Sequence, residues 1–338
     1  MTDVLAGIPR IDLGFTPTPL EPLDRLSETL GGPRIWIKRD DCTGLATGGN
    51  KTRKLEFLMA DAIAQRADTV ITFGAVQSNH ARQTAAACAK LGLACHLILT
   101  RRVAWKHPEY EVSGNVLFDR LLGAHVHVTE STDAEHFSSK LVDDLTRQGK
   151  RCYSVPTGGS NAIGALGYVR CAAEIVDQSR HLGFRPDLIA HATSSGGTQT
   201  GLITGMLAAN VDCEILGINV YDADHNRIER RMARLLDEVL RQVKIDANAS
   251  ARVRIVHEFL GDDYGIPTRQ TLDAIATLAS TEGILADPVY SGKALGGLLE
   301  MVRRKDLGGC NNVVFVHTGG VASLALYAGA FAPDGRYE

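Results

Sequence analysis

Short apolar runs alternate with amphipathic stretches along most of the chain. Eight runs rich in β-branched and other apolar residues predict strands, at residues 34–38, 69–73, 95–99, 125–128, 152–155, 188–192, 214–220 and 312–316. The clearest helical pattern covers residues 50–66, where apolar side chains recur at spacings of three and four, at Leu55, Leu58, Met59, Ala62 and Ile63. This alternation predicts an α/β protein with a parallel sheet covered by helices on both faces, in which ligands bind beyond the carboxyl ends of the strands.

Length, composition and charge narrow the class of protein. The 338 residues exceed the size of most single hydrophobic cores, so two domains, or one large sheet with an insertion, are expected. With 44% hydrophobic and 22% charged residues, the chain is not expected to be disordered. The net charge of −3 provides no field that would attract nucleic acid or an anionic lipid surface. No apolar run approaches the length of a bilayer span, and the first residues lack the pattern of a signal peptide, so we expect a cytoplasmic protein with no nucleic-acid or membrane partner.

Cysteine and histidine spacing indicates neither a disulfide framework nor a metal site. The seven cysteines are scattered, odd in number and never spaced as CxxC, which is typical of reduced thiols in a reducing compartment. His125 and His127 would lie on one face of a strand, but no third ligand is evident. We therefore expect no metal, and an exposed strand face is the simpler interpretation of the two histidines.

Lys51 lies in a segment that would place an amine at the start of a helix. Gly48 and Gly49 admit backbone angles that a side chain forbids, and Asn50 is predicted to cap the helix that follows. The positive end of the helix dipole lowers the pKa of an ammonium in the first turn, and a neutral amine can form a Schiff base. The alternative is that Lys51 is an ordinary exposed helix lysine, like Lys54 one turn later.

A second segment, residues 193–198, has the features of a phosphate site. It follows a predicted strand, precedes a predicted helix and consists of Thr193, Ser194, Ser195, Gly196, Gly197 and Thr198. Small residues let backbone N–H groups converge on an anion, the hydroxyls add donors, and the helix N-terminus adds a positive dipole end. The spacing matches neither GxGxxG nor GxxxxGK[ST], so neither a dinucleotide nor a nucleoside triphosphate is favoured. The alternative is a simple tight turn.

A third polar turn, formed by Ser78, Asn79 and His80, follows the predicted strand 69–73 and opens a helix. Such groups at a helix N-terminus can hold a substrate carboxylate, although a cap at Ser78 or Asn79 and a surface position for His80 is the simpler interpretation. One cofactor, pyridoxal 5′-phosphate, needs both a lysine that forms an imine and a phosphate site. The sequence therefore predicts a pyridoxal-phosphate site that joins Lys51 to the turn at 193–198.

Eight motifs spread over nearly the whole chain carry a resemblance to a known family. They are IKRDD (37–41), GGNKTRKLEF (48–57), QSNHARQTAA (77–86), GGSNAIGALGY (158–168), SSGGTQTGL (194–202), DYGIPT (263–268), EGILADPVYSGKA (282–294) and HTGG (317–320). With these motifs the chain resembles the fold-type II pyridoxal-phosphate enzymes, in the branch that contains D-cysteine desulfhydrase, L-cysteate sulfo-lyase and 1-aminocyclopropane-1-carboxylate (ACC) deaminase. The resemblance implies a tryptophan synthase β-like fold of two open, twisted, mostly parallel sheets covered by helices.

The resemblance also implies a role for each matching residue. Lys51 would be the Schiff-base lysine and would remove the Cα proton of the substrate. Asn79 would bond the 3-oxygen of the cofactor and contact the substrate, while Ser78, counted among the catalytic residues, and His80 would face the substrate. The residues from Thr193 to Thr198 would hold the phosphate.

Other matching positions separate the branches of this family. Tyr264 and Tyr290 would line the substrate side of the cofactor ring, and either would act as an acid or orient the ring. Ser291 and Thr318 would contact the cofactor, and Thr318 also the substrate. ACC deaminases typically carry Glu, Leu and Gln at the positions of Ser291, Thr318 and His80. Because a hydroxyl stabilises charge on the pyridine nitrogen less than a carboxylate, the resemblance favours loss of a leaving group from Cβ over ring opening.

The activity implied by this resemblance is a carbon–sulfur lyase reaction on a cysteine-like amino acid. L-cysteate would release sulfite, or D-cysteine would release sulfide, with pyruvate and ammonia as the other products. A sulfonate would need several donors, which His80, Ser78, Thr318 or the basic loop at Arg101 and Arg102 would supply, whereas a thiol needs fewer. Residues 44–62 and 287–298 look closer to the cysteate enzymes and residues 158–168 to the desulfhydrases, and L-cysteate is narrowly preferred. The alternatives are ACC deaminase-type ring opening, a β-replacement synthase and, outside the enzymes, a ligand-binding protein that kept the fold.

The same resemblance implies a division into two domains. Residues 1–47 and 161–338 would form a large pyridoxal-phosphate-binding domain, and residues 48–160 a small domain that bears Lys51 and Asn79. The active site would lie between them, and closure of the small domain would expel water. Relatives are usually homodimers, so we expect a homodimer that binds a small amino acid.

Overall fold

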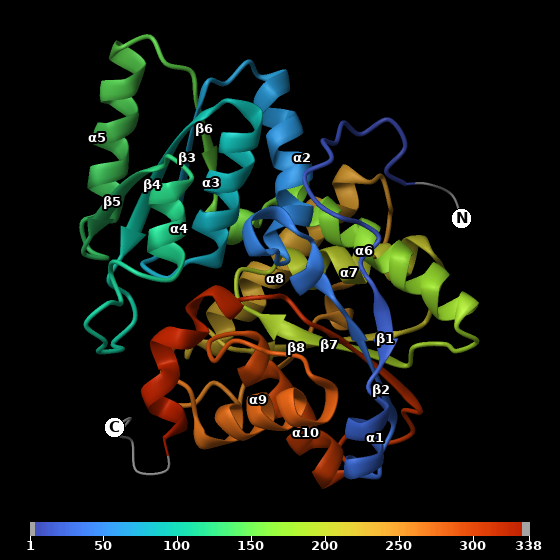
Figure 1. The fold of residues 1–338 in the computed structure, drawn as a ribbon. Helices are drawn as coiled ribbons and strands as arrows, with labels where there is room; N and C mark the ends of the chain where they lie inside the picture. The colour runs from blue at the N-terminus through green and yellow to red at the C-terminus, as the bar shows by residue number, and fades with distance from the viewer. Residues whose placement is uncertain (1–3, 333–338) are drawn as a thin grey trace.

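Two sheets of mostly parallel strands organise the protein, whose structure is a computed structural model that describes residues 4–332 (Figure 1). The larger sheet has the strand order β1 (Leu20–Pro22), β2 (Arg34–Lys38), β10 (Asn312–Val316), β7 (Leu188–Thr193), β8 (Glu214–Asn219) and β9 (Arg254–Val256). The smaller sheet has the order β5 (His125–Thr129), β4 (Ala94–Thr100), β3 (Thr69–Ala75) and β6 (Cys152–Val155). Strand β1 is antiparallel to β2, and the other neighbouring pairs are parallel.

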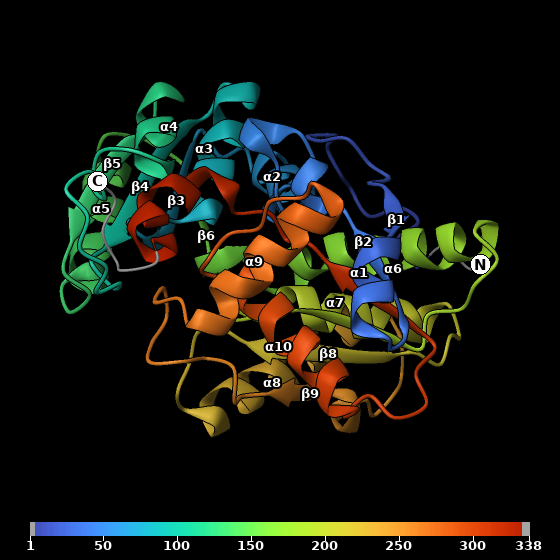
Figure 2. The ribbon, with the colours of Figure 1, turned by 60° about the horizontal axis from the view of Figure 1, so that its bottom comes forward.

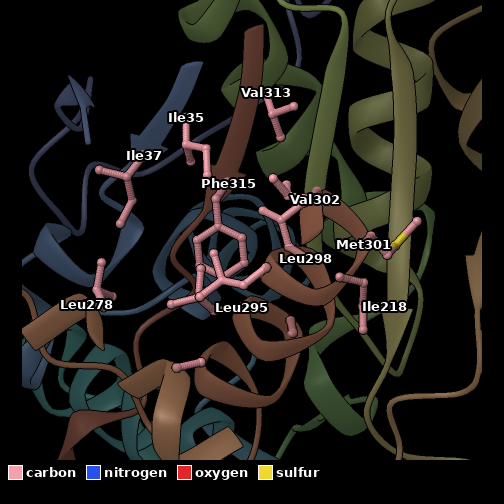
Figure 3. Packing of buried hydrophobic residues seen from close by; sticks show 14 of the residues in the cluster. Ile35, Ile37, Ile218, Leu278, Leu295, Leu298, Met301, Val302, Val313 and Phe315 are labelled. Carbon is pink, nitrogen blue, oxygen red and sulfur yellow. The ribbon is translucent and has the colours of Figure 1, made fainter. Parts of the chain in front are cut away.

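Helices cover both faces of the larger sheet because successive side chains of a strand point to opposite faces. One face packs against α1 (Asp24–Leu30), α9 (Arg269–Glu282) and α10 (Ser291–Arg304), and the other against α6 (Ala162–His181), α7 (Gly197–Ala208) and α8 (His225–Gln242). Figure 3 shows Ile35, Ile37 and Phe315 in the first of these cores. Trp36 and Val314, their neighbours in sequence, belong to the second core.

The smaller sheet is covered in the same way. On one face lie α2 (Lys51–Ala64), α3 (Asn79–Leu91) and α4 (Asn115–Leu121), and on the other lies α5 (Ala134–Arg147). Short 3-10 helices span Asp40–Cys42, Leu45–Thr47, Thr157–Gly159, Ser250–Arg252 and Val321–Phe331. The last of these packs beside the smaller sheet, where Leu326 accepts a hydrogen bond at 2.9 Å from Trp105 Nε1 (Figure 2).

All eight predicted strands are confirmed within one or two residues. The sequence did not reveal β1 and β9, since each has only three residues, too few to show a period-two pattern. The predicted helix at 50–66 is α2, and Leu55, Leu58, Met59 and Ala62 are buried as the apolar stripe required. Ile63 is the exception at 44% exposed, so the stripe is one residue narrower than predicted.

The two-domain division stays a prediction, although the four strands of the smaller sheet all fall within residues 48–160. The apolar core of this sheet also takes in Leu13, Tyr264 and Tyr327, which lie outside that range. Residues 1–3 and 333–338, at the ends of the predicted large domain, lie outside the described residues. Across residues 4–332, no helix has the length and apolar character needed to cross a membrane.

Candidate active site

A cavity of about 740 Å³ opens where strand ends from both sheets meet. The segments that directly follow β3, β6, β7 and β10 line it, as expected for a ligand site beyond the carboxyl ends of parallel strands. Of the residues predicted for the site, all except Gly197 and Ser291 line this cavity. Thr193 also lines the cavity, but the proton of its hydroxyl is donated to Gln199 Oε1 at 2.8 Å and not to a ligand in the cavity.

Lys51 is the first residue of α2 and forms part of the cavity wall. Asn50 occupies the N-cap position, but its side chain does not cap the helix. Its Nδ2 donates instead to Thr198 Oγ1 at 3.3 Å, so the prediction that Asn50 caps α2 is wrong because a tertiary contact takes up its amide. This hydrogen bond joins the lysine segment to the serine- and glycine-rich turn, which are therefore adjacent, as the sequence predicted.

The amine of Lys51 lacks a hydrogen-bond acceptor among residues 4–332. Burial lowers the pKa of Lys51 to about 8, because the ammonium loses hydration in the cavity and no carboxylate compensates for the loss. The sequence predicted this direction from the helix dipole, whereas the structure gives burial as the cause. Near neutral pH a larger fraction of this amine is therefore neutral and able to act as a nucleophile or a base.

The turn after β7 forms a cradle with the loop after β6. Ser195 Oγ lies 2.7 Å from Ser160 Oγ, and the Gly197 N–H donates to Ser160 Oγ at 3.2 Å. A Cβ at Gly197 would lie 2.9 Å from Ser160 Oγ and 3.0 Å from Lys54 Nζ, so a larger residue would crowd the cradle. Ser160 is a site residue that the motif at 193–198 alone did not indicate.

Lys54 lies behind this cradle, and the expectation that it is exposed is wrong. Its side chain is 1% exposed, and its Nζ donates to Gly158 O at 3.1 Å and to Ser160 Oγ at 2.9 Å. Burial, and then the charge of Lys51, lowers the pKa of Lys54 well below its usual range. The one signal in the sequence was the spacing of three residues between the two lysines, which places them on the same side of a helix.

At the N-terminus of α3, Ser78 both caps the helix and lines the cavity, so the two interpretations of this turn from the sequence hold together. Ser78 caps the helix by accepting a hydrogen bond from Ala81 N at 3.1 Å, and it also lines the cavity. His80 is buried rather than at the surface, with Nε2 at 2.8 Å from Thr72 Oγ1. The Thr72 hydroxyl also lies 2.9 Å from Val155 O, and when it donates its single proton there, Nε2 carries the histidine proton.

The side chain of His80 lies close enough to Lys51 and Lys54 to feel their charges. Its Nδ1 is buried and has no hydrogen-bond partner within the described part of the chain. Burial, with the neighbouring charges of Lys51 and Lys54, lowers the pKa of His80 well below its usual range. His80 therefore lines the cavity as a neutral imidazole and does not provide a cation for a substrate.

Two tyrosines from different elements meet at the cavity. The Tyr264 and Tyr290 hydroxyls form a short hydrogen bond, and both residues line the cavity. Burial raises the pKa of both phenols, so both keep their protons near neutral pH and can donate but not act as bases. Asp287, which the sequence reasoning missed, fixes the backbone here: its carboxylate accepts from Val289 N, Tyr290 N and Ser291 N at 3.0, 2.8 and 2.7 Å.

The two arginines considered for binding a sulfonate differ in position. Arg101 is exposed, does not line the cavity and pairs with Glu111 and Glu130. Arg102 lines the cavity, and its guanidinium is engaged with Asp263 through two hydrogen bonds of 2.8 and 2.9 Å. Neither arginine is therefore an unpaired cation that faces a substrate.

The histidines on β5 do not build a metal site. His127 Nε2 lies 3.1 Å from His96 Nδ1, and the ring of His125 stacks on that of His96. Within residues 4–332 no group of three or more His, Cys, Asp and Glu side chains is placed to hold a metal ion.

The sequence from residue 11 to residue 319 matches the family model described as "Pyridoxal-phosphate dependent enzyme". The chain belongs to the family of pyridoxal-phosphate dependent enzymes. Two D-cysteine desulfhydrases, from Serratia proteamaculans (strain 568) and Yersinia enterocolitica serotype O:8 / biotype 1B, are 44% and 42% identical to it over 329 and 326 residues. Each match covers 96% of this chain and 97% of the relative.

A solved structure agrees with this assignment. The structure of an ACC deaminase homologue is similar to the whole chain, with a TM-score of 0.88 at 36% identity and coverage of 97% of both chains. The predicted fold-type II architecture and the resemblance to this branch of pyridoxal-phosphate enzymes are confirmed.

The cavity fits pyridoxal 5′-phosphate at both ends of the molecule. Lys51 offers an amine that no group of residues 4–332 engages, as an aldehyde partner requires. The cradle offers the hydroxyl of Ser195, the N–H groups that begin α7 and, behind them, the amine of Lys54, whose protonated form a phosphate dianion would stabilise. The roles of the individual residues stay predictions.

The hydroxyls predicted to lie near the pyridine nitrogen also form a defined pair. Ser291 is fully buried, and its Oγ donates to Gly319 O at 2.8 Å. Since this uses its single proton, the contact of 3.2 Å between Ser291 Oγ and Thr318 Oγ1 must have Thr318 as the donor. Thr318 therefore presents only oxygen lone pairs to the cavity, and Ser291 contributes by orienting it.

Replacement of Tyr290 by phenylalanine is expected to lower kcat by about 10²- to 10³-fold, because the phenol proton that would assist the reaction is removed. The affinity for the cofactor should stay within about threefold of the wild-type value, because the ring of the side chain is kept. Steady-state kinetics and fluorescence titration of the apoenzyme with cofactor would measure both quantities. Tyr153→Phe is the matched control, since this partly buried phenol bonds Asp61 away from the cavity. A Tyr290→Phe enzyme with full activity would exclude a proton-donating role for this phenol.

Proposed function

We propose that this pyridoxal-phosphate enzyme is a carbon–sulfur lyase that acts on D-cysteine and converts it, with one water, to hydrogen sulfide, pyruvate and ammonia. The observation that carries the proposal is the match to D-cysteine desulfhydrases over almost the whole length of both chains. When bound, the cofactor supplies an electron sink for the pair left at Cα after the proton is removed. The protein must then hold the substrate, remove that proton and assist the leaving group.

Lys51 is proposed as the group that takes the Cα proton. Its amine is buried and has a lowered pKa, so it is neutral often enough near neutral pH to act as a base. The N-terminus of α3, with Ser78 beside it, is proposed to bind the substrate carboxylate through backbone N–H groups and the helix dipole. His80, which lines the cavity as a neutral imidazole, is proposed to face the bound substrate and shape that side of the cavity.

The pair Tyr264 and Tyr290 is proposed to give a proton to the departing sulfur. One phenol donates to the other, so one phenol proton of the pair remains for a ligand in the cavity. The carbon–sulfur bond breaks as its electron pair goes to sulfur, and the phenol proton converts the departing hydrosulfide to hydrogen sulfide. Both phenols have raised pKa values and therefore hold this proton until it is needed.

We propose D-cysteine as the substrate in place of L-cysteate, which the sequence narrowly favoured. A sulfonate is a permanent anion that needs several donors, whereas a thiol needs few. Arg101 lies outside the cavity and Arg102 is already paired with Asp263, and the relatives named above support D-cysteine. We further propose that the enzyme is a homodimer and that it is cytoplasmic.

Incubation of the enzyme with single candidate substrates tests the proposal. We expect sulfide and pyruvate from D-cysteine with kcat/KM at least about tenfold above that for L-cysteate, L-cysteine or ACC, because a site built for one leaving group and one configuration discriminates against the others. Sulfide, sulfite, pyruvate and 2-oxobutanoate are measured separately. An added thiol would reveal β-replacement as a new thioether. Faster release of sulfite from L-cysteate than of sulfide from D-cysteine would overturn the substrate assignment and leave the lyase chemistry intact.

A further inference from the structure

Arg82 lies in the first turn of α3, is buried behind the cavity wall and has no role in the proposed reaction. Its side chain is 1% exposed and does not line the cavity. All of its hydrogen bonds go to neutral oxygens: Ala46 O at 2.9 Å, Gly48 O at 2.8 Å, Asn79 Oδ1 at 2.8 Å, and Asn115 Oδ1. Burial lowers the pKa of Arg82 to about 10, and the charge of Asp119 opposes this shift, but no hydrogen bond joins Asp119 to Arg82 among residues 4–332. The neutral oxygens therefore supply the hydrogen bonds that a buried guanidinium needs.

The first consequence concerns the amide of Asn79. Its Oδ1 accepts from Arg82 Nη1 at 2.8 Å and from Asn115 Nδ2 at 3.2 Å, which occupies both lone pairs of that oxygen. Its Nδ2 has no acceptor among the described residues, and Asn79 lines the cavity. In the flipped orientation the Asn79 NH₂ would face two other donors, so Arg82 and Asn115 select the orientation in which both amide protons are available to the cavity.

The second consequence concerns the segment before Lys51. Arg82 binds the carbonyls of Ala46 and Gly48, which lie in a turn where Ala46, Thr47 and Gly48 have φ values of +42°, +68° and +74°. Non-glycine residues rarely adopt such angles, so this turn needs tertiary contacts to hold it. One guanidinium therefore connects the start of α3 to the turn that leads into α2, as the proximity of these helices in Figure 1 also indicates.

We propose that Arg82 is a positioning residue that fixes Asn79 as a hydrogen-bond donor and holds it in register with Lys51. With the cofactor bound, Asn79 would hold its ring oxygen and Lys51 its aldehyde. Hydrogen bonding of a cation to Oδ1 also polarises the amide, which makes its N–H a stronger donor to an anionic oxygen. This inference rests on the cofactor assignment and on the predicted contact of Asn79 with the ring oxygen, and it is independent of which amino acid is the substrate.

A double-mutant cycle on the apoenzyme tests the proposal through cofactor affinity, measured by fluorescence titration without substrate. Arg82→Met is expected to weaken cofactor binding at least about tenfold in the wild-type background and less than about threefold in an Asn79→Ala background, since the guanidinium acts through that amide. The visible absorbance of cofactor bound to Arg82→Met should shift toward that of Asn79→Ala. Arg82→Lys, which keeps the charge but not the fork of donors, should lie between Arg82→Met and the wild type.

Arg170 provides the matched control, because its guanidinium bonds Thr16 and Glu56 away from the cavity. Arg170→Met should leave affinity and spectrum unchanged in both backgrounds. If Arg82→Met does not fold, Asn115→Ala replaces it, since Asn115 donates to the same oxygen and should show the same dependence on Asn79. Equal losses of affinity in both backgrounds, or no loss beyond that of Arg170→Met, would overturn the proposal. Failure of D-cysteine turnover would contradict only the proposed function, because no substrate enters this experiment.

Discussion

Lys51→Ala is expected to abolish the absorbance that arises from the covalent link between chain and cofactor and to lower turnover by at least about 10³-fold, because the chain loses both its attachment to the cofactor and its proposed base. Lys51 lines the cavity, and its amine has no hydrogen-bond acceptor among residues 4–332. Burial lowers the pKa of this amine to about 8. Loss of that amine should leave the phosphate cradle intact, so the variant should still bind cofactor, but weakly and reversibly. Absorbance spectra before and after gel filtration, together with pyruvate release, would measure this.

Lys150→Ala is the control for this experiment, because Lys150 is exposed in the connection between α5 and β6 and does not line the cavity. It should retain the spectrum and turnover of the wild type. A Lys51→Ala protein that kept both would disprove the assignment of Lys51. A variant that lost turnover but kept the wild-type absorbance through gel filtration would assign Lys51 to proton transfer and contradict its attachment to the cofactor.

Lys54→Met is expected to weaken cofactor binding about 100-fold while it stabilises the apoenzyme. In the loaded enzyme the Lys54 ammonium would face a phosphate dianion across the cradle, and hydrogen bonds and charge pairs of this kind are each worth several-fold to 100-fold in affinity. In the apoenzyme the same ammonium is buried with no carboxylate partner, so its removal relieves a desolvation cost. Methionine has a similar shape and no charge.

The pH dependence of stability checks this account of Lys54. Its folded-state pKa lies well below the ordinary 10.5, so the folded protein disfavours the charged form, and the destabilisation is fully present below the folded pKa. It disappears as the pH rises toward 10.5, the ordinary lysine value. The stability gained by Lys54→Met in the apoenzyme should therefore shrink as the pH is raised, which urea unfolding at several pH values would measure.

Lys293 is a matched control for the lysine behind the cradle. It is also buried, burial lowers its pKa to about 8, and its Nζ donates to Leu260 O and Asp263 O at 2.6 and 3.1 Å. Because its Nζ contacts these two carbonyls and not Ser160 of the cradle, Lys293→Met should leave the affinity for the cofactor unchanged. Equal losses of affinity in the Lys54→Met and Lys293→Met proteins would show that Lys54 acts through general stability and not through the phosphate site.

The sequence determined the strands, the fold family and the position of the site at the strand ends. Strand prediction succeeded because runs such as residues 34–38 and 312–316 are short, apolar and bounded by turns, which are local properties. The motifs around Lys51, Asn79 and residues 193–198 were informative because glycine, hydroxyl and amide groups at the start of a helix have few other uses in that combination.

Only the tertiary structure decided how the polar groups of the site are partnered. The sequence predicted an exposed Lys54, because the apolar pattern of a helix does not show which loop will cover a polar residue. In the structure the loop at residues 157–160 covers Lys54. The amide of Asn50 leaves its cap position for Thr198, and Arg82 reaches Asn79 and the turn before Lys51, through contacts between segments that are distant in sequence. Burial and hydrogen-bond partners are properties of the packed chain, so the pKa shifts and donor directions that they cause cannot be deduced from local spacing.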